Sequence, residues 1–317
     1  MAEQIIAPSF PFFPSMASKL TSLEDAIARN VWDGCSIALG LALEHSIPFA
    51  AVHEIIRQGK RGLTLIGPIS DMAFDQLIGA GCVGKVMAAW VGNVSHGMGY
   101  NFSRAVESGR VKMIDYSNLA IAQAILAAAL GIPCIPTKTL LGSDMLSSLV
   151  AEGFAKLVEC PFTGERMVML KAVKPDVAII HTQRCDEMGY AQMWGNYGIV
   201  REACQAADRV VVTTEEIIPH EEITKDPNSV VCPPHKVAAV AKVEYGAHPS
   251  PLAGYYNRDH SCFREYYQES RTPEGFRRWL SKWVLQPRSR ADYLRLIRLD
   301  EIRVKNPIEA GVRVYGY

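Results

Sequence analysis

The stretch VAAVAKVEYGAHPS, residues 237–250, decides how this chain folds. Its first half is a continuous run of small and β-branched apolar residues, which is typical of a strand buried on both faces of a sheet. Its second half is a turn, because Gly246 can adopt backbone conformations closed to other residues and Pro249 excludes His248 from the helical region. A polar turn directly after a buried strand is where α/β proteins place functional loops.

Similar apolar runs occur along most of the chain, and most of them precede a segment with helical spacing. Further strands are predicted at residues 35–39, 63–66, 86–91, 111–114, 167–170, 177–181 and 209–214, with an extended segment at 133–136. Helices are predicted at residues 23–31, 48–58, 72–78, 102–108, 119–130, 199–207, 260–270, 273–285 and 288–298. Asp71 is placed to cap the third helix, and the nearly all-apolar composition of 119–130 predicts a buried helix.

This alternation predicts an α/β fold with an open, mostly parallel sheet, helices on both faces and a helical C-terminal layer. Residues 139–165 contain loop signals that can frame an insertion, and residues 219–236 are proline-rich and loop-like. No clear linker divides the chain. One domain is therefore expected over residues 18–317, after an N-terminal arm at residues 1–17.

The charge balance and the cysteine pattern exclude several classes of protein. The 33 basic residues match the 33 acidic ones, which argues against a general binder of nucleic acid but leaves room for a local basic site for a phosphorylated cofactor. The eight cysteines form no CxxC pair, so neither a zinc ribbon nor a thioredoxin-like motif is predicted. Because no signal-peptide pattern or membrane-spanning apolar run occurs, we expect a reduced, cytoplasmic protein without a membrane partner.

The common nucleotide, hydrolase and metal motifs are absent from the sequence. The segment GMG at 97–99 lacks the third glycine of a dinucleotide fingerprint, and neither a phosphate-binding loop nor a GxSxG elbow occurs. The eight histidines are dispersed without an HxH or HExxH pair, so no metal site is predicted.

Glycines at the ends of predicted strands mark the candidate site. Gly40, Gly67 and Gly92 close three strands, and Gly246 follows a fourth. Ligands in open α/β sheets bind beyond the carboxyl ends of the strands, so these turns are either site loops or ordinary strand–helix connections. The set of glycines favours site loops more strongly than any single member does.

Polar side chains near these glycines each allow two interpretations. Glu44 and His45, after the first glycine, either face a substrate or form a solvated pair. His248 either contacts a ligand or braces a loop by hydrogen bonds, or else it is satisfied within its own turn. Glu215 and Glu216, at the end of the strongest strand, serve either as general acid and base or as a brace for neighbouring loops.

Arginines and tryptophans elsewhere in the chain can also be interpreted either as ligand-binding residues or as structural ones. Arg104 and Arg184 can hold a phosphate or carboxylate, or they form surface salt bridges. Trp279 and Trp283 lie four positions apart on one helical face, which predicts a packing face and not a ligand site.

Several segments match, in order, the pattern of the A subunits of family I coenzyme A transferases of the glutaconate type. They are SIALG (36–40), AVHEIIRQG (51–59), FDQLIGAG (74–81), DYS (115–117), AAALGIP (127–133), PDVAIIH (175–181), TEEII (214–218) and YGAHPS (245–250). The chain therefore resembles such an A subunit over most of its length.

The resemblance implies a protein that pairs with a homologous B subunit, in a hetero-oligomer of α2β2 type. Such an enzyme moves coenzyme A between carboxylic acids by a ping-pong route, in which the acyl-CoA thioester is attacked by a glutamate of the B subunit. The nucleophile would then not be on this chain. The acyl-CoA and the acid would be substrates, and no permanently bound cofactor would be present.

The resemblance also implies that this chain shapes part of the acid-substrate pocket. Ser95 lies close to where the family's A subunit offers a hydroxyl near the substrate. The other residues expected at the site, on neighbouring strand-end loops, are Gly40, Glu44, His45, Ser70, Asp71, Gly92, Asn93 and His248.

Departures from the family pattern leave other activities open. Leu41 and the pair Glu44-His45 stand where the family often has a second glycine and a basic or polar pair, so the acid can differ from glutaconate. A related branch hydrolyses carbon–carbon bonds in CoA thioesters and carries an acid near the position of Asn118, which is neutral here. Further alternatives are a decarboxylase of the same fold and a non-catalytic binding subunit.

Overall fold

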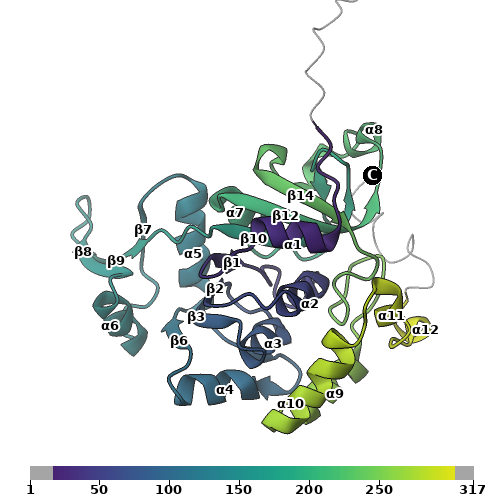
Figure 1. Ribbon diagram of the computed structural model, residues 1–317. Helices are drawn as coiled ribbons and strands as arrows, with labels where there is room; N and C mark the ends of the chain where they lie inside the picture. The colour runs from purple at the N-terminus through teal and green to yellow at the C-terminus, as the bar shows by residue number, and fades with distance from the viewer. Residues whose placement is uncertain (1–16, 304–317) are drawn as a thin grey trace, which may run out of the picture.

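The computed structural model describes residues 17–303, and within that range the chain is built around a nine-stranded sheet (Figure 1). The parallel strands run in the spatial order β14-β12-β10-β1-β2-β3-β6, so the predicted, mostly parallel sheet is confirmed. These strands are β1 (Ser36–Ala38), β2 (Leu63–Ile66), β3 (Val83–Ala88), β6 (Lys112–Asp115), β10 (Val177–Cys185), β12 (Arg209–Ile217) and β14 (Val237–Lys242). Short antiparallel pairs extend the sheet beyond the end of β10 through β11 (Ala191–Gln192) and β13 (Val230–Cys232).

The central strands β10 and β12 carry both the core and the first polar groups of the candidate site. They pair in parallel from Val177 opposite Arg209 to Cys185 opposite Ile217. Their first halves are buried and apolar, which anchors the sheet through the hydrophobic effect. Their second halves turn polar, so His181 and Glu215 are delivered to the carboxyl edge of the sheet.

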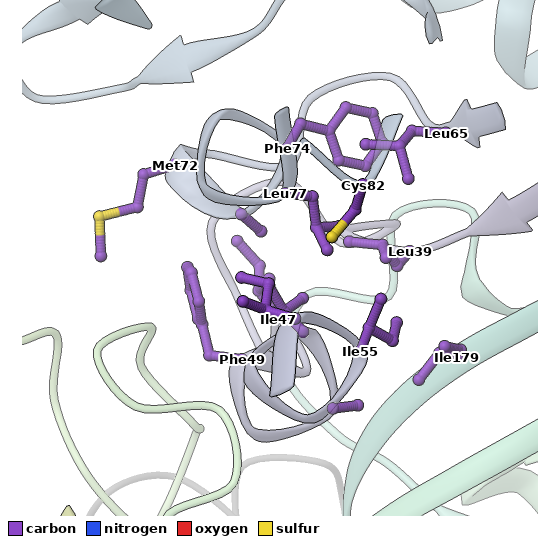
Figure 2. Close-up of a cluster of buried hydrophobic side chains, with 14 of the residues drawn as sticks. Leu39, Ile47, Phe49, Ile55, Leu65, Met72, Phe74, Leu77, Cys82 and Ile179 are labelled. Carbon is purple, nitrogen blue, oxygen red and sulfur yellow. The ribbon is translucent and has the colours of Figure 1, made fainter. Parts of the chain in front are cut away.

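Strand side chains alternate between two faces, and helices cover each face. Ile37 and Leu65 point into one buried cluster, whereas Ala38 and Ile66 point into the other. The first face is covered by α1 (Leu23–Asn30), α2 (Phe49–Arg57), α3 (Met72–Gly79) and α4 (Tyr100–Glu107), and the second by α5 (Asn118–Ala129) and α7 (Val200–Ala206). Figure 2 shows part of the first cluster, in which Phe74 of α3 shares one set of buried side chains with Leu65 of β2.

The predicted helical C-terminal layer is confirmed, and it packs on the first face. It consists of α9 (His260–Glu269), α10 (Pro273–Leu280), a π-helical turn (Ser281–Leu285), α11 (Arg290–Leu294) and α12 (Leu299–Ile302). Trp279 and Trp283 are buried there, and Trp279 meets the Tyr266 ring at 4.7 Å between centroids. Both tryptophans therefore form a packing face, as predicted.

One predicted strand belongs to a different sheet. β9 (Arg166–Lys171) pairs with β7 (Cys134–Thr137) and β8 (Ala155–Glu159) in a separate antiparallel sheet. The burial of β9 alternates along its length, which is typical of a strand with one solvated face. The segment at 139–165, left as loops around an insertion, contains α6 (Asp144–Ala151) as well as β8.

Two further sequence predictions are wrong in part. The helix expected to be buried at 119–130 is only half-covered, because Leu119 and Leu130 are 57% and 61% exposed. The segment at 219–236 is not a continuous loop, since it forms α8 (His220–Ile223) and β13, with short 3-10 turns at Pro227–Ser229 and Pro234–Lys236. In both places tertiary pairing, which local composition does not encode, decides the outcome.

The N-terminal arm predicted at residues 1–17 lies outside the described residues except for its last position, and the single domain expected over 18–317 stays a prediction. Within residues 17–303, no helix has the length and apolar composition needed to cross a membrane. All eight cysteines are free thiols.

We expect Phe74→Ala to destabilise the purified chain by about 3–5 kcal/mol, because it removes a wholly buried ring and leaves a cavity between α3 and the sheet. The free energy of unfolding in urea measures this loss. Leu119→Ala, which trims an exposed side chain, is the matched control and should cost less than about 0.5 kcal/mol. Equal losses in the two variants would contradict this position for the core.

Candidate functional site

The loops after β1, β2 and β3 meet at the carboxyl edge of the sheet, because these strands are parallel neighbours. Gly40 in the first loop packs against Ser70 in the second, and an ideal Cβ on Gly40 would lie 2.1 Å from Ser70 Cβ. Gly40 also has φ +67°, which side chains rarely tolerate. The close approach of these two loops therefore requires a glycine at this strand end.

Arg258 joins the loops through two carboxylates, and we call Glu44, Asp71 and Arg258 the arginine cluster. Arg258 Nη2 lies 2.7 Å from Asp71 Oδ2, and Nη1 lies 3.0 Å from Glu44 Oε2. The guanidinium also stacks on Phe263, 3.6 Å from the ring centroid. The Asp71 side chain is 0% exposed and that of Glu44 is 45% exposed, so one acid holds the cation from the interior and the other from the solvent side.

Asp71 precedes α3 but does not cap it, so the predicted cap is wrong. Its φ is +48° and its side chain accepts no bond from the helix; Oδ1 instead accepts the Val94 N–H at 3.1 Å. Arg258 and Val94, both distant in sequence, compete successfully for this carboxylate. Burial raises the pKa of Asp71 from 3.8 to about 6, although Arg258 and the Val94 N–H oppose that change.

A hairpin of β4 (Gly92–Asn93) and β5 (Gly97–Met98) follows β3. Gly92 thus begins a hairpin and does not close the preceding strand, which ends earlier, at Ala88. The Asn93 amide donates to Phe263 O at 3.0 Å, and its Oδ1 accepts the Ser95 N–H at 3.2 Å. The hairpin is thereby fixed beside the arginine cluster.

The two serines predicted at the site, Ser70 and Ser95, differ in their exposure to solvent. Ser95 is exposed at the turn of the hairpin. Ser70 is wholly buried beneath Gly40, and its hydroxyl has no hydrogen-bond partner among residues 17–303. Ser95 is therefore the hydroxyl that a ligand can reach directly.

The structure does not bring His45 and His248 into the arginine cluster. His45 Nε2 accepts the Ala253 N–H at 2.9 Å, and burial lowers the pKa of His45 to about 4. His248 is buried between Asp259, whose Oδ2 lies 3.0 Å from Nε2, and the Tyr293 hydroxyl, 2.9 Å from Nδ1. Both histidines bond other segments of the chain, and because Asp259 and Tyr293 lie outside the turn of His248, that histidine braces loops and is not satisfied within its own turn.

Glu215 braces the turn after β14. Its Oε1 lies 2.9 Å from His181 Nε2 and accepts the Gly246 N–H at 2.9 Å and the Tyr256 hydroxyl at 2.8 Å. Oε2 accepts the Tyr245 N–H at 2.7 Å. Burial alone would raise the pKa of Glu215, but these donors hold it below its usual value. The structural interpretation of this acid is therefore the observed one.

The remaining candidates lie outside the cluster. Arg184 pairs with Glu216 at 3.4 Å, and Arg104 donates to the carbonyls of Ser270 and Arg271. Among the described residues, no group of His, Cys, Asp and Glu side chains is arranged to hold a metal ion.

Arg258 is the member of the arginine cluster that the sequence did not predict. It lies in an irregular segment eight positions after Ser250, at no spacing that links it to either acid. The sequence feature that could have indicated Arg258 is a basic side chain shortly after the turn at 245–250. Only the fold makes it the partner of Glu44 and Asp71.

Comparisons with known proteins identify the family to which the chain belongs. The family model described as coenzyme A transferase matches residues 20–242. The chain is 37% identical over 270 residues to the A subunit of 3-oxoadipate CoA-transferase from Pseudomonas knackmussii, covering 84% of this chain and 94% of that one. It is 35% identical over 291 residues to the A subunit of glutaconate CoA-transferase from Acidaminococcus fermentans, covering 87% and 91%. The crystal structure of glutaconate coenzyme A-transferase from that organism superposes with a TM-score of 0.86 at 34% identity, over 90% of this chain and 96% of that one.

We expect Asp71→Asn to change how stability depends on pH. Folded Asp71 keeps its proton up to about pH 6, whereas the unfolded carboxyl loses it near pH 4. This group therefore stabilises the fold below about pH 4, and its contribution is lost as the pH rises to about 6. The free energy of unfolding of the wild type minus that of Asp71→Asn should fall by about 2–3 kcal/mol across this window, as measured in urea.

Asp208→Asn is the matched control for this pH series, because Asp208 is a paired but exposed carboxylate far from the arginine cluster. A difference between wild type and Asp71→Asn that stays flat, or that rises with pH, would contradict the buried, easily protonated carboxyl.

Proposed function

The chain belongs to the family I coenzyme A transferases as an A subunit, and we propose that it forms the acid-binding half of an active site whose nucleophile comes from a B subunit. The resulting enzyme moves coenzyme A from an acyl-CoA to a free carboxylic acid. Hydrolysis and decarboxylation of a CoA thioester are not favoured, because both relatives named above are subunits of transferases.

The main support for this proposal is the burial of Asp71 and the pairing of both Asp71 and Glu44 with Arg258. A carboxylate that attacks a thioester has to approach the carbonyl carbon freely. Asp71 is wholly buried and held by Arg258 and the Val94 N–H, and Glu44 is paired with the same guanidinium. Neither acid is poised for attack, which supports a nucleophile supplied from outside this chain.

The ping-pong route then divides into two halves. The B-subunit glutamate attacks the thioester carbonyl, the C–S bond breaks, and an acyl–glutamyl anhydride and CoA thiolate result. The thiolate attacks the glutamyl carbonyl, which releases the first acid and leaves a glutamyl–CoA thioester. The second acid reverses these steps. Coenzyme A is thus a substrate in both halves and no cofactor stays bound.

The arginine cluster supports a dicarboxylic acid as the substrate class. The names of both relatives contain a dicarboxylic acid, 3-oxoadipate in one and glutaconate in the other. One carboxylate of such an acid would react, and the other would bind Arg258 in place of the half-exposed Glu44. Asp71 would stay on the guanidinium as the buried counter-charge, and the Ser95 hydroxyl would bond the acid nearby.

A second protein is supported by the surface that borders the cluster. Leu43, Val94 and Met98 are 38%, 40% and 55% exposed there, and they belong to the same loops as the site residues. A B subunit that covers them would seal the pocket from water, which strengthens every electrostatic interaction inside it. We extend this arrangement to an α2β2 oligomer in the cytoplasm.

We expect no CoA transfer by the purified chain alone and acid-dependent CoA exchange once its B subunit is added. Hydroxylamine cleavage or borohydride reduction during turnover should label a glutamate, and peptide mapping should find it on the B subunit. Unaided transfer by this chain, or label on Glu44 or Asp71, would overturn the proposed division of roles.

Variants of the arginine cluster should move the KM for the dicarboxylic acid in opposite directions. Glu44→Gln removes the competitor for Arg258 and should lower KM by about 2–5-fold. Arg258→Lys removes the planar fork and should raise KM by about tenfold. The KM for a monocarboxylic acid should change little in either variant.

The pair Arg184–Glu216 provides the matched control for these kinetics, since it is also an arginine–glutamate pair but lies outside the cluster. Arg184→Lys and Glu216→Gln should leave both KM values unchanged. Equal effects of Arg258→Lys on monocarboxylic and dicarboxylic acids would contradict the role given to Arg258.

A further inference from the structure

A second polar pocket lies between α1, α2, the end of β14 and the segment that leads into α11. Its volume is about 190 Å³. The basic residues that line it are Arg57, Lys242, Arg288 and Arg290, and the acidic ones are Glu24 and Glu54. None of these residues belongs to the arginine cluster, so the pocket is a site of its own.

The positive charges of this pocket are not balanced by its acids. Arg57 pairs with Glu54 at 2.9 Å, and Glu54 also accepts a bond from the Gln58 side-chain amide at 2.8 Å, so this acid already has two partners. Within residues 17–303, no carboxylate lies within ion-pair distance of Lys242, Arg288 or Arg290. The chain as a whole carries no net charge, so this local surplus of cations is not a reflection of its composition.

Among these excess cations, Arg290 is the one that hydrogen bonds hold in place. Its side chain is half-buried, its Nε donates to Glu244 O at 2.7 Å, and its Nη2 donates to Tyr245 O. Its guanidinium also lies 4.3 Å from the centroid of the Tyr293 ring. These partners hold the cation in place, but carbonyls and a ring do not neutralise it. A partly desolvated cation of this kind gains most from an anionic partner.

We propose that this pocket binds a phosphate group, with Arg290 as its fixed donor and Arg288 and Lys242 closing over the remaining oxygens. Several donors around one small space suit a tetrahedral oxyanion better than a single carboxylate. A volume of about 190 Å³ accommodates a phosphate or pyrophosphate group. The group can come from a free ion or from one end of a larger phosphorylated molecule.

The contacts of Arg290 connect this pocket to the loops of the strand-end site. Arg290 holds the first residues of the turn at 244–250, and at the other end of that turn the Ser250 hydroxyl donates to Glu44 O. An anion that fixes Arg290 would therefore restrain the turn. Two amides of this turn report on the restraint: that of Gly246, which donates to Val243 O and Glu215 Oε1, and that of His248, which donates to Tyr245 O.

Binding is measured on the full chain in complex with its B subunit, by calorimetry and thermal unfolding at constant ionic strength. The ligands are inorganic phosphate, pyrophosphate and adenosine 3′,5′-bisphosphate, each against chloride. At saturation we expect Tm to rise by about 3 °C or more and amide exchange at Gly246 and His248 to slow. Binding of the free ions identifies a free anion as the source, and binding of the bisphosphate alone, where it depends on Lys242 and Arg288, identifies a larger phosphorylated molecule.

The double variant Lys242→Ala/Arg288→Ala removes two exposed cations and leaves the core intact. It should weaken binding at least tenfold and abolish the Tm shift, while CoA transfer without added anion stays unchanged. The matched control Lys225→Ala/Arg278→Ala removes two exposed cations elsewhere and should bind as the wild type does. The proposal is overturned if no ligand binds above the chloride reference, if the Lys242/Arg288 variant binds normally, or if the control loses binding equally.

Discussion

The carboxylate of Glu215 is the interaction on which the rest of this structure depends. It stands at the end of β12 and gathers His181 from β10, the backbone of Tyr245 and Gly246 after β14, and the hydroxyl of Tyr256 from the C-terminal segment. A buried carboxylate is costly unless several donors compensate it, and here the donors come from three separate parts of the chain. Gly246 is needed because an ideal Cβ there would lie 2.4 Å from His181 Cε1.

The hydrogen bonds of Glu215 also influence the arginine cluster, to which they are linked through the turn that contains His248. The turn that Glu215 holds contains His248, and His248 in turn bonds Asp259, the neighbour of Arg258. Arg258 then meets Glu44 and Asp71 on loops that follow different strands. The site is thus assembled by the sheet edge and not by any local motif. Its guanidinium is held between a buried acid, Asp71, and a half-exposed acid, Glu44.

The sequence predicted the sheet and most of the helices because buried parallel strands leave a strong local signal, as β10 and β12 do. It also placed Gly40 and Ser70 on strand-end loops, although it did not predict the close contact between them. It failed where the deciding partner is remote. Asp71 looked like a helix cap because Val94 and Arg258 are invisible to local spacing, and His45 was grouped with Glu44 although the two side chains point to different partners. The apolar helix at 119–130 was expected to be buried because composition does not reveal which face is left uncovered.

The apolar side chains of Leu43, Val94 and Met98 around the arginine cluster have a consequence for the life of the chain before assembly. Exposed apolar side chains on the loops of one site promote self-association when no partner covers them. A newly made copy without its partner subunit would therefore tend to aggregate or to be degraded. Its abundance in the cell would then follow that of the partner subunit. Synthesis of the two chains together would then be needed to keep this chain from aggregating, as well as to form the active enzyme.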